Sequence, residues 1–195
     1  MIKRIFDIFS SILAILAFLP LYFIVGILVY YSLGWPIIYR AKRAGKSNKE
    51  FTLIKFRSMK NTTNHVSHHS GDDDPRITKL GKFIRQTKLD ELPQLVNVLF
   101  GKMSIVGPRP ETPEYIKLYS KEQMKILNIR PGITDYASIE FSNLGDILKG
   151  DNPDKLYFEK VWDKKMKLRM KYTQENNFFI DLKIIFLTIM AIFKK

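Results

Sequence analysis

The feature of this chain that most constrains its fold is an uncharged run of 24 residues from Ile8 to Tyr31. At the helical rise of about 1.5 Å per residue, such a segment is long enough to cross a bilayer core of roughly 30 Å. No small-residue cleavage site of the signal-peptide kind follows it, so we expect the segment to be retained. The sequence therefore predicts an N-terminal membrane anchor.

The anchor is predicted to enter the bilayer and return rather than to cross it. Pro20 lies near the middle of the run, where a proline kinks a helix. Basic residues flank the run on both sides: Lys3 and Arg4 before it, and Arg40, Lys42 and Arg43 after it. Because basic flanks favour the cytoplasmic side, both ends are expected there. We predict a kinked re-entrant anchor over residues 1–36 and a catalytic domain over residues 37–195; a single transmembrane span is the alternative.

The overall charge calls for an anionic partner. The chain has 32 Lys and Arg against 19 Asp and Glu, a formal net charge of +13. The basic residues lie beside apolar segments, which fits membrane phospholipids and phosphate substrates better than nucleic acid, for which we find no motif. There is no cysteine, so disulfides and thiolate catalysis are excluded.

Residues 87–111, TKLDELPQLVNVLFGKMSIVGPRPE, read as a candidate active site. Proline is tolerated in the first turn of a helix, so Pro93 predicts a helix that begins at Asp90. A buried stripe at helical spacing (Leu92, Leu95, Val96 and Leu99) and a left-handed C-cap at Gly101 complete this helix. Asp90 and Glu91 would then be held ionised by the helix N-terminus, which suits a nucleophile or a metal ligand. Ordinary helix caps are the alternative.

The same stretch ends in an arginine between two prolines. Pro108 and Pro110 restrict the backbone on both sides of Arg109, so the guanidinium is presented in a preset direction. A guanidinium can grip a phosphate through a fork of donors. An ordinary turn with a solvated arginine is the alternative.

A basic strand precedes this site. FTLIKFRSM at residues 51–59 alternates as a strand, with Lys55 and Arg57 on the face opposite Ile54 and Phe56. Both cations are candidate phosphate ligands, unless this is a solvated face.

Two further regions are less specific. Residues 61–71 read as a mobile loop, and we assign no metal site to the histidines it contains: His65, His68 and His69. Residues 155–171 form a basic amphipathic helix that lies on a membrane or packs on the protein's own core. The stretch 178–193 is predicted to be interfacial or docked on the anchor.

These segments, in order, resemble the bacterial sugar transferase family, the monotopic polyprenyl-phosphate phosphoglycosyl transferases. The resemblance rests on KRIFDI at 3–8, FTLIKFRSM at 51–59, DDPRITKLGKFIRQTKLDELPQLVNVLFGKMSIVGPRPE at 73–111, RPGIT at 130–134 and FFIDLKIIFLT at 178–188. It implies a mostly helical α+β fold with a small β element, a kinked re-entrant helix and interfacial helices. This chain departs from the family at Leu19, where a serine is usual, at Asp135 and at Arg169.

The resemblance implies the transfer of a sugar-1-phosphate from a UDP-sugar to undecaprenyl phosphate, with release of UMP. Asp90 would be the nucleophile that forms an aspartyl phosphosugar, and Glu91 would assist it; both would hold Mg²⁺. Arg109, set by Pro108 and Pro110, would bind phosphate. Further phosphate-binding candidates are Arg85, Lys55, Arg57 and Arg76.

The resemblance also places the protein at the cytoplasmic face of the bacterial inner membrane, in the first membrane step of a glycoconjugate (polysaccharide) pathway. The sugar, the exact polyprenyl acceptor and the pathway are left open, as is a homo-oligomer. Two rival functions remain: a sugar-only glycosyltransferase that releases UDP, and a non-catalytic basic membrane scaffold.

Overall fold

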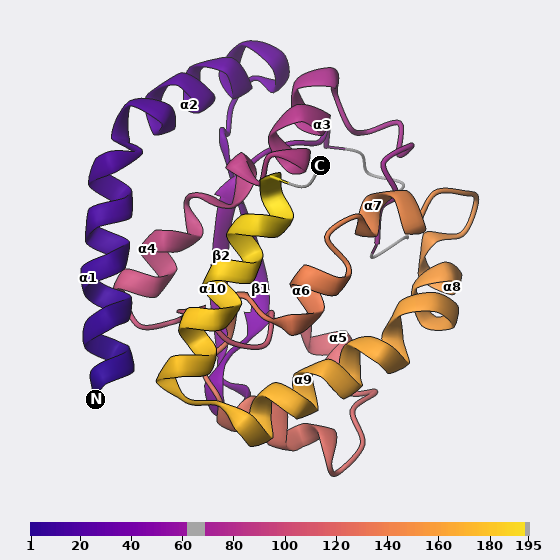
Figure 1. Ribbon diagram of the computed structural model, residues 1–195. Coiled ribbons are helices and arrows are strands. Elements are labelled where there is room, and N and C mark those ends of the chain that lie inside the picture. The colour runs from indigo at the N-terminus through magenta and orange to yellow at the C-terminus, as the bar shows by residue number, and fades with distance from the viewer. Residues whose placement is uncertain (62–68, 194–195) are drawn as a thin grey trace.

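The structure is a computed structural model that describes residues 1–61 and 69–193, in which helices surround two small sheets (Figure 1). In chain order the helices and strands are α1 (Ile2–Ala17), α2 (Leu19–Leu33), β1 (Ile38–Ala44), β2 (Glu50–Phe56), α3 (Lys79–Gln86), α4 (Gln94–Leu99), β3 (Ser104–Val106), α5 (Pro113–Ile116), β4 (Gly132–Thr134), α6 (Tyr136–Glu140), α7 (Leu144–Ile147), α8 (Pro153–Tyr157), α9 (Asp163–Glu175) and α10 (Phe178–Phe193). The predicted α+β, mostly helical class is confirmed.

The N-terminal segment is a bent pair of helices. α1 and α2 meet at Phe18 with a bend of 63°. Pro20 lies in the first turn of α2, where its missing N–H leaves no helical bond unmade. The predicted kink at Pro20 is therefore confirmed. Within the described residues no one helix has the length and apolar character to cross a bilayer, whereas this bent pair has both when its two helices are taken together.

Arg4 attaches α1 to α4. Its guanidinium donates hydrogen bonds of 2.6 and 2.8 Å to the carbonyls of Val98 and Leu99, at the C-terminal end of α4. The Val98 carbonyl also accepts from the Gly101 amide at 2.9 Å, and Arg4 completes the C-cap of the helix. Gly101, at φ +74°, has the left-handed conformation predicted for the end of this helix.

Lys3 and Asp7 attach α1 to the rest of the chain. The Lys3 ammonium donates to the Val106 carbonyl at 2.9 Å and pairs with Asp181 of α10. The buried Asp7 carboxylate accepts from Ser104 Oγ and from the Ile105 amide, each at 3.0 Å. Lys3 and Arg4, the basic residues predicted to flank the anchor at its N-terminal end, thus contact other groups of the protein.

The hairpin β1–β2 lies at the centre of the molecule (Figure 1) and contributes Lys55 to the candidate site. Its strands are antiparallel, with Tyr39 opposite Lys55. On one face Phe51 and Leu53 pack with Val98 and Met103, and on the other Phe56 packs against α2. Asn97 of α4 fixes the helix to β2. Its side chain accepts from the Ile54 amide at 3.1 Å and donates to the Thr52 carbonyl at 2.9 Å.

The second sheet joins two sequence motifs. β3, which precedes Pro108, pairs in parallel with β4, which follows Arg130. Gly107 and Gly132 allow this approach, because a Cβ on Gly132 would lie 2.1 Å from the Gly107 nitrogen. The residues that follow β3 therefore run directly beside the RPGIT segment, residues 130–134.

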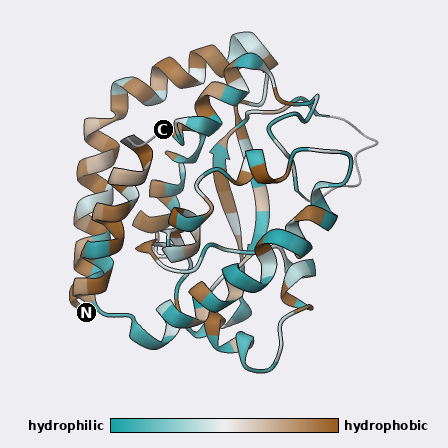
Figure 2. Cartoon of the chain, turned by 45° about the vertical axis from the view of Figure 1, so that its right-hand side comes forward, coloured by the Kyte–Doolittle hydropathy of each residue, from teal (hydrophilic) through white to brown (hydrophobic). Residues whose placement is uncertain are grey.

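The C-terminal helices resolve two alternatives left by the sequence. Along residues 153–175, Tyr157, Val161 and Met166 are buried, so this stretch packs on the protein's own core. α10 docks on α1, where the rings of Phe6 and Phe178 are 5.4 Å apart. Figure 2 shows hydrophobic residues concentrated on α1, α2 and α10, whereas α9 is mostly hydrophilic.

Candidate active site

Asp90 and Glu91 lie in a single 3₁₀ turn, Leu89–Glu91, that precedes α4. The predicted α-helix from Asp90 is wrong in this respect, because Lys88 has a left-handed φ of 60° and α4 begins only at Gln94. The predicted apolar stripe is also wrong: Leu92, Leu95, Val96 and Leu99 are half-buried, and Gln94, Asn97 and Val98 are the buried residues. The reason is that α4 lies between α1 and β2, so its apolar side chains are shared between two partners (Figure 1).

Asp90 is a buried residue beside several cations. It is 4% exposed, and none of the described residues donates to it. Burial raises the pKa of Asp90 above that of an ordinary aspartate, although the nearby charge of Lys55 acts to lower it. The sequence predicted a carboxylate held ionised by a helix end, and the site instead relies on neighbouring cations. Asp90 is therefore a carboxylate with free lone pairs in a basic surrounding.

Glu91 and Arg109 form a forked ion pair. The guanidinium donates to both carboxylate oxygens of Glu91, at 2.8 Å each. Burial acts to raise the pKa of Glu91, but the charges of Arg109, Lys88 and Lys55 and the hydrogen bonds from Arg109 together outweigh burial and lower it. Glu91 is thus ionised beside the less acidic Asp90, and the two adjacent carboxylates have different environments.

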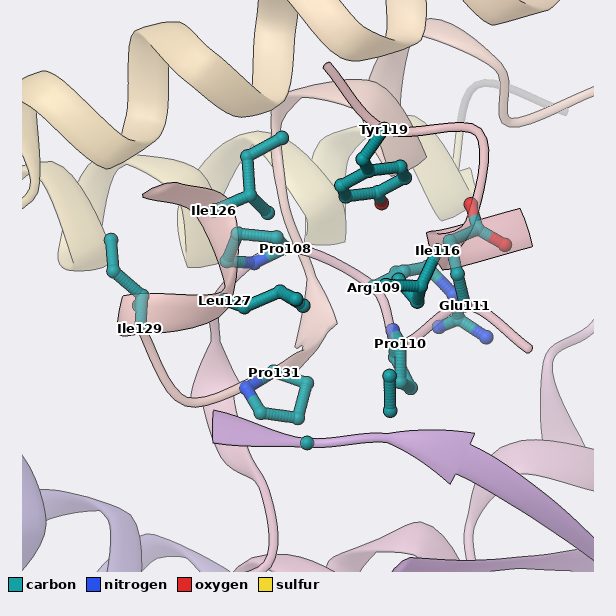
Figure 3. Close-up of a pocket in the computed structure, with 12 residues that line it drawn as sticks. Pro108, Arg109, Pro110, Glu111, Ile116, Tyr119, Ile126, Leu127, Ile129 and Pro131 are labelled. Carbon is teal, nitrogen blue, oxygen red and sulfur yellow. The ribbon is translucent and has the colours of Figure 1, made fainter. Parts of the chain in front are cut away.

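The Pro108–Pro110 segment directs Arg109 toward Glu91. The Arg109 guanidinium also donates to the Ile133 carbonyl, and its backbone amide donates to Asp135 Oδ2 at 3.2 Å. Pro108 and Pro110 lie on either side of it and line, with Arg109, a pocket with room for about one water molecule (Figure 3). The direction of the Arg109 guanidinium is thus fixed toward Glu91, and phosphate binding by Arg109 stays a prediction.

Lys55 and Arg85 complete the basic surrounding of Asp90. Burial lowers the pKa of Lys55, and the charge of Asp90 opposes that shift. The Lys55 ammonium lies 5.5 Å from the centre of the Tyr39 ring. Arg85, in the last turn of α3, donates to Ser70 Oγ at 3.1 Å and is among the cations that act on Asp90. Both cations act on the Asp90 carboxylate, and phosphate binding by Lys55 and Arg85 stays a prediction.

Two predicted phosphate ligands, Arg57 and Arg76, form hydrogen bonds with other groups of the protein. The buried Arg57 guanidinium donates to the carbonyls of Leu33 and Gly34, so it caps the end of α2. Arg76 pairs with Asp74 through hydrogen bonds of 3.0 and 2.7 Å. Alternation along a strand identified which side chains share a face, but it could not show that Arg57 lies beyond β2 and beneath a helix end.

The histidine region divides into two parts. The His69 ring stacks on the Tyr157 ring with 3.7 Å between their centres, and His69 Nδ1 lies 2.8 Å from Asp154 Oδ1. His65, His68 and most of the predicted loop 61–71 lie outside the described residues. Within residues 1–61 and 69–193, no group of three or more acidic or histidine side chains is arranged to hold a metal ion.

Asp90 and Glu91 together offer hard oxygen ligands, which suits Mg²⁺ when a substrate supplies the remaining oxygens.

Sequence reasoning missed a cluster of buried charges behind Arg109. The cluster consists of Glu111, Asp135, Lys165 and Arg169. Its available signal was the spacing of Lys165 and Arg169, four residues apart and beside the apolar Met166, since buried cations require acidic partners.

Comparison with known proteins finds a family match along the whole chain. A sequence profile of the family described as bacterial sugar transferase matches residues 1–195. The chain is 34% identical to the uncharacterized sugar transferase EpsL of Bacillus subtilis (strain 168), covering 98% of this chain and 87% of EpsL.

Two longer relatives carry more specific names. The chain is 36% identical to the UDP-glucose:undecaprenyl-phosphate glucose-1-phosphate transferase of Escherichia coli (strain K12), covering 97% of this chain and 39% of that protein. It is 34% identical to the UDP-N-acetylgalactosamine-undecaprenyl-phosphate N-acetylgalactosaminephosphotransferase of Aeromonas hydrophila, covering 98% of this chain and 43% of that protein. With a profile match over every residue and this level of identity, the chain belongs to the bacterial sugar transferase family.

Proposed function

We propose that this protein is a phosphoglycosyl transferase that moves a sugar-1-phosphate from a UDP-sugar to undecaprenyl phosphate and releases UMP. The names of its two longer relatives describe transfer of a phosphosugar from a UDP-sugar to undecaprenyl phosphate, and the chain spans less than half of their length. The observation that carries the proposal is the Asp90 carboxylate, buried without a hydrogen bond among the described residues, beside the Glu91–Arg109 pair.

In the proposed first step, an Asp90 oxygen attacks the sugar-bearing phosphorus of the donor. The bond from that phosphorus to the bridging oxygen breaks, and UMP leaves with the bridging oxygen and its electron pair. The product is an acyl phosphate that joins Asp90 to the sugar-1-phosphate. Burial favours this attack, since a carboxylate with few hydrogen bonds need not give them up to react.

In the second step, a phosphate oxygen of undecaprenyl phosphate attacks the same phosphorus. The Asp90 carboxylate leaves, which regenerates the enzyme and forms a lipid-linked diphosphate sugar. No proton is gained or lost in either displacement, so neither step requires a general base. The chemistry depends mainly on positioning and on neutralising phosphate charge.

The remaining residues would neutralise the donor diphosphate. Arg109 presents its guanidinium beside the nucleophile, and Lys55 and Arg85 add positive charge around it. Asp90 and Glu91 would hold Mg²⁺ together with donor phosphate oxygens, and the bound ion would supply further charge neutralisation. Arg57 caps the end of α2 and Arg76 pairs with Asp74, groups outside the Asp90–Glu91 turn, so neither has a part in this proposal.

We further propose that the bent pair α1–α2 is a re-entrant anchor at the cytoplasmic face of the bacterial inner membrane. The polyprenyl tail of the acceptor remains in the bilayer, while the donor is soluble, so the reaction belongs at the interface. Large apolar side chains exposed on α1, α2 and α10 support contact with phospholipid, among them Phe9, Leu16, Phe23, Phe179 and Phe186 (Figure 2).

The test is a donor screen with the full chain in detergent, undecaprenyl phosphate and a panel of UDP-sugars. We expect UMP and a lipid diphosphate sugar with at least one donor. Release of UDP would instead identify a sugar-only glycosyltransferase, and absence of any product with every donor would favour a non-catalytic scaffold. Mass spectrometry of enzyme incubated with donor alone should find the phosphosugar on Asp90.

A further inference from the structure

The cluster behind Arg109, formed by Glu111, Asp135, Lys165 and Arg169, is connected to the site through the backbone. Asp135 is 1% exposed and directly follows β4. Its Oδ2 accepts from the Arg109 amide at 3.2 Å, while its Oδ1 accepts from the amide and the hydroxyl of Ser138 at 2.7 and 2.6 Å. One carboxylate therefore holds both the Arg109 segment and the start of α6.

Arg169 provides the compensating charge for Asp135. Its side chain is 1% exposed, and its Nε lies 3.6 Å from Asp135 Oδ2. Its Nη1 donates to Glu111 Oε1 at 2.7 Å and to the Tyr119 hydroxyl at 3.2 Å. Tyr119 and Glu111 line the pocket that Arg109 also lines (Figure 3). A buried arginine thus bridges two carboxylates, one that lies two residues after Arg109 in the sequence and one whose oxygen accepts from the Arg109 amide.

The charges in this part of the molecule are balanced. Lys165 donates to the same Glu111 oxygen at 2.7 Å. Glu91, Glu111 and Asp135 therefore face the three cations Arg109, Lys165 and Arg169. Removing one member of a buried set leaves another charge uncompensated, which is far more damaging than the loss of an exposed pair. The cluster has the properties of a fixed support, because any shift of Asp135 disturbs both the Arg109 amide and Arg169.

We propose that Asp135, with its charge balanced by Arg169, is a positioning residue that orients Arg109 toward the donor diphosphate. Asp135 does not touch the substrate in this proposal; it acts through the Arg109 amide. The proposal rests on the proposed function, in which Arg109 binds donor phosphate. The contact through which Asp135 acts is the hydrogen bond from the Arg109 amide to Asp135 Oδ2.

The experiment compares Asp135→Asn with the wild-type full chain in detergent. Asparagine keeps the size of the side chain and one acceptor but removes the charge. We expect the KM for the UDP-sugar to rise by about tenfold or more, the size expected for one charge-assisted hydrogen bond, with the KM for undecaprenyl phosphate unchanged. A purely structural role would lower the active fraction and kcat while leaving both KM values as they are, and that result would overturn the proposal.

Ser138→Ala is the matched control. It removes a hydroxyl donor from the same carboxylate without changing its charge, and we expect the donor KM to stay within about twofold, as for other substitutions that spare the key contact. An equal rise in donor KM for Ser138→Ala and Asp135→Asn would assign the effect to the cap of α6 and overturn the role of the Arg109 amide.

A double-mutant cycle tests the partnership with Arg169. Arg169→Met should also raise the donor KM, and the effect of Asp135→Asn should be smaller in the Arg169→Met background, because Asp135 has then already lost its compensating charge. Additive effects would contradict the pairing. An inactive wild type would defeat the proposed function itself, whereas an active wild type with an unaltered donor KM in Asp135→Asn would defeat only this inference.

Discussion

The Arg109 guanidinium and the Glu91 carboxylate are joined by two parallel hydrogen bonds of 2.8 Å, although they come from motifs 18 residues apart. This pair unites the carboxylate turn and the proline-flanked arginine into one site. It also fixes the plane of the guanidinium before any substrate is bound, which reduces the entropy lost when a phosphate is gripped.

Replacing Arg109 with lysine should therefore be a severe change. Lysine keeps the charge but cannot hold both oxygens of Glu91, so we expect kcat/KM for the donor to fall by roughly 10- to 100-fold. Arg40→Lys is the matched control, since Arg40 is exposed on β1 and forms no such pair with the residues that the structure describes. Equal activity of Arg109→Lys and Arg40→Lys would show that the forked geometry is unimportant.

Asp90→Asn should abolish turnover. An amide is a poor nucleophile, so we expect UMP release to fall by at least about 10³-fold while the protein still sediments with membranes. Asp163→Asn, an exposed aspartate at the start of α9, should keep wild-type activity. An Asp90→Asn protein that turns over normally would rule out this nucleophile.

The pH dependence of the first step should report the environment of Asp90. Its pKa is raised by burial, so protonation, and with it loss of the nucleophile, should occur at a higher pH than for an ordinary aspartate. Activity is retained above this raised pKa and lost as the pH falls through it. Because the charge of Lys55 lowers the pKa of Asp90, Lys55→Met should move the acid limb of donor kcat/KM to still higher pH. Lys60→Met, at an exposed position, is the control, and an unchanged acid limb in Lys55→Met would contradict the assignment.

Removal of divalent cations with EDTA should stop UMP release, and added Mg²⁺ should restore it. Since two carboxylates and the donor phosphates would hold the ion, Glu91→Gln should require a higher Mg²⁺ concentration for half-maximal rate. Glu122→Gln, an exposed change outside the site, should follow the wild-type titration. Full activity in EDTA would exclude the metal.

Arg4→Met should destabilise the protein. It removes the guanidinium donor from the Leu99 carbonyl and leaves the Val98 carbonyl with only the Gly101 amide, a loss of about 1–3 kcal/mol, and for a chain of this size each kcal/mol lowers Tm by roughly 2–4 °C. Thermal unfolding in detergent measures the change, with Lys102→Met as the exposed control on the next turn. Identical melting of the two variants would show that the cap contributes nothing.

Local chemistry explains which features could be predicted from the sequence. Pro20 and Gly101 act through backbone preferences that hold in any surrounding, so the bend and the helix end were predictable. Asp90, Glu91 and Arg109 lie within 20 residues of one another in motifs that the family resemblance links, and the Glu91–Arg109 pair brings them together.

Features that depend on long-range contacts could not be predicted. Arg57 looked like a site cation because alternation is a local signal, whereas its partners are carbonyls 23 and 24 residues earlier. The pairing of Glu111 with Arg169 spans 58 residues, and nothing in either segment alone identifies the other. The 3₁₀ turn at Asp90 follows from the left-handed Lys88, a conformation that lysine seldom adopts.

The bonds from Arg4 to the end of α4 also bear on protein engineering. A fragment that starts at residue 37, made for easier handling in water, would lack Lys3, Arg4 and Asp7. The C-terminal end of α4, the helix that follows Asp90, would then lose its hydrogen bonds to Arg4. A better route to a detergent-free enzyme keeps α1 in place and exchanges its outward-facing Phe9, Leu13 and Leu16 for polar residues.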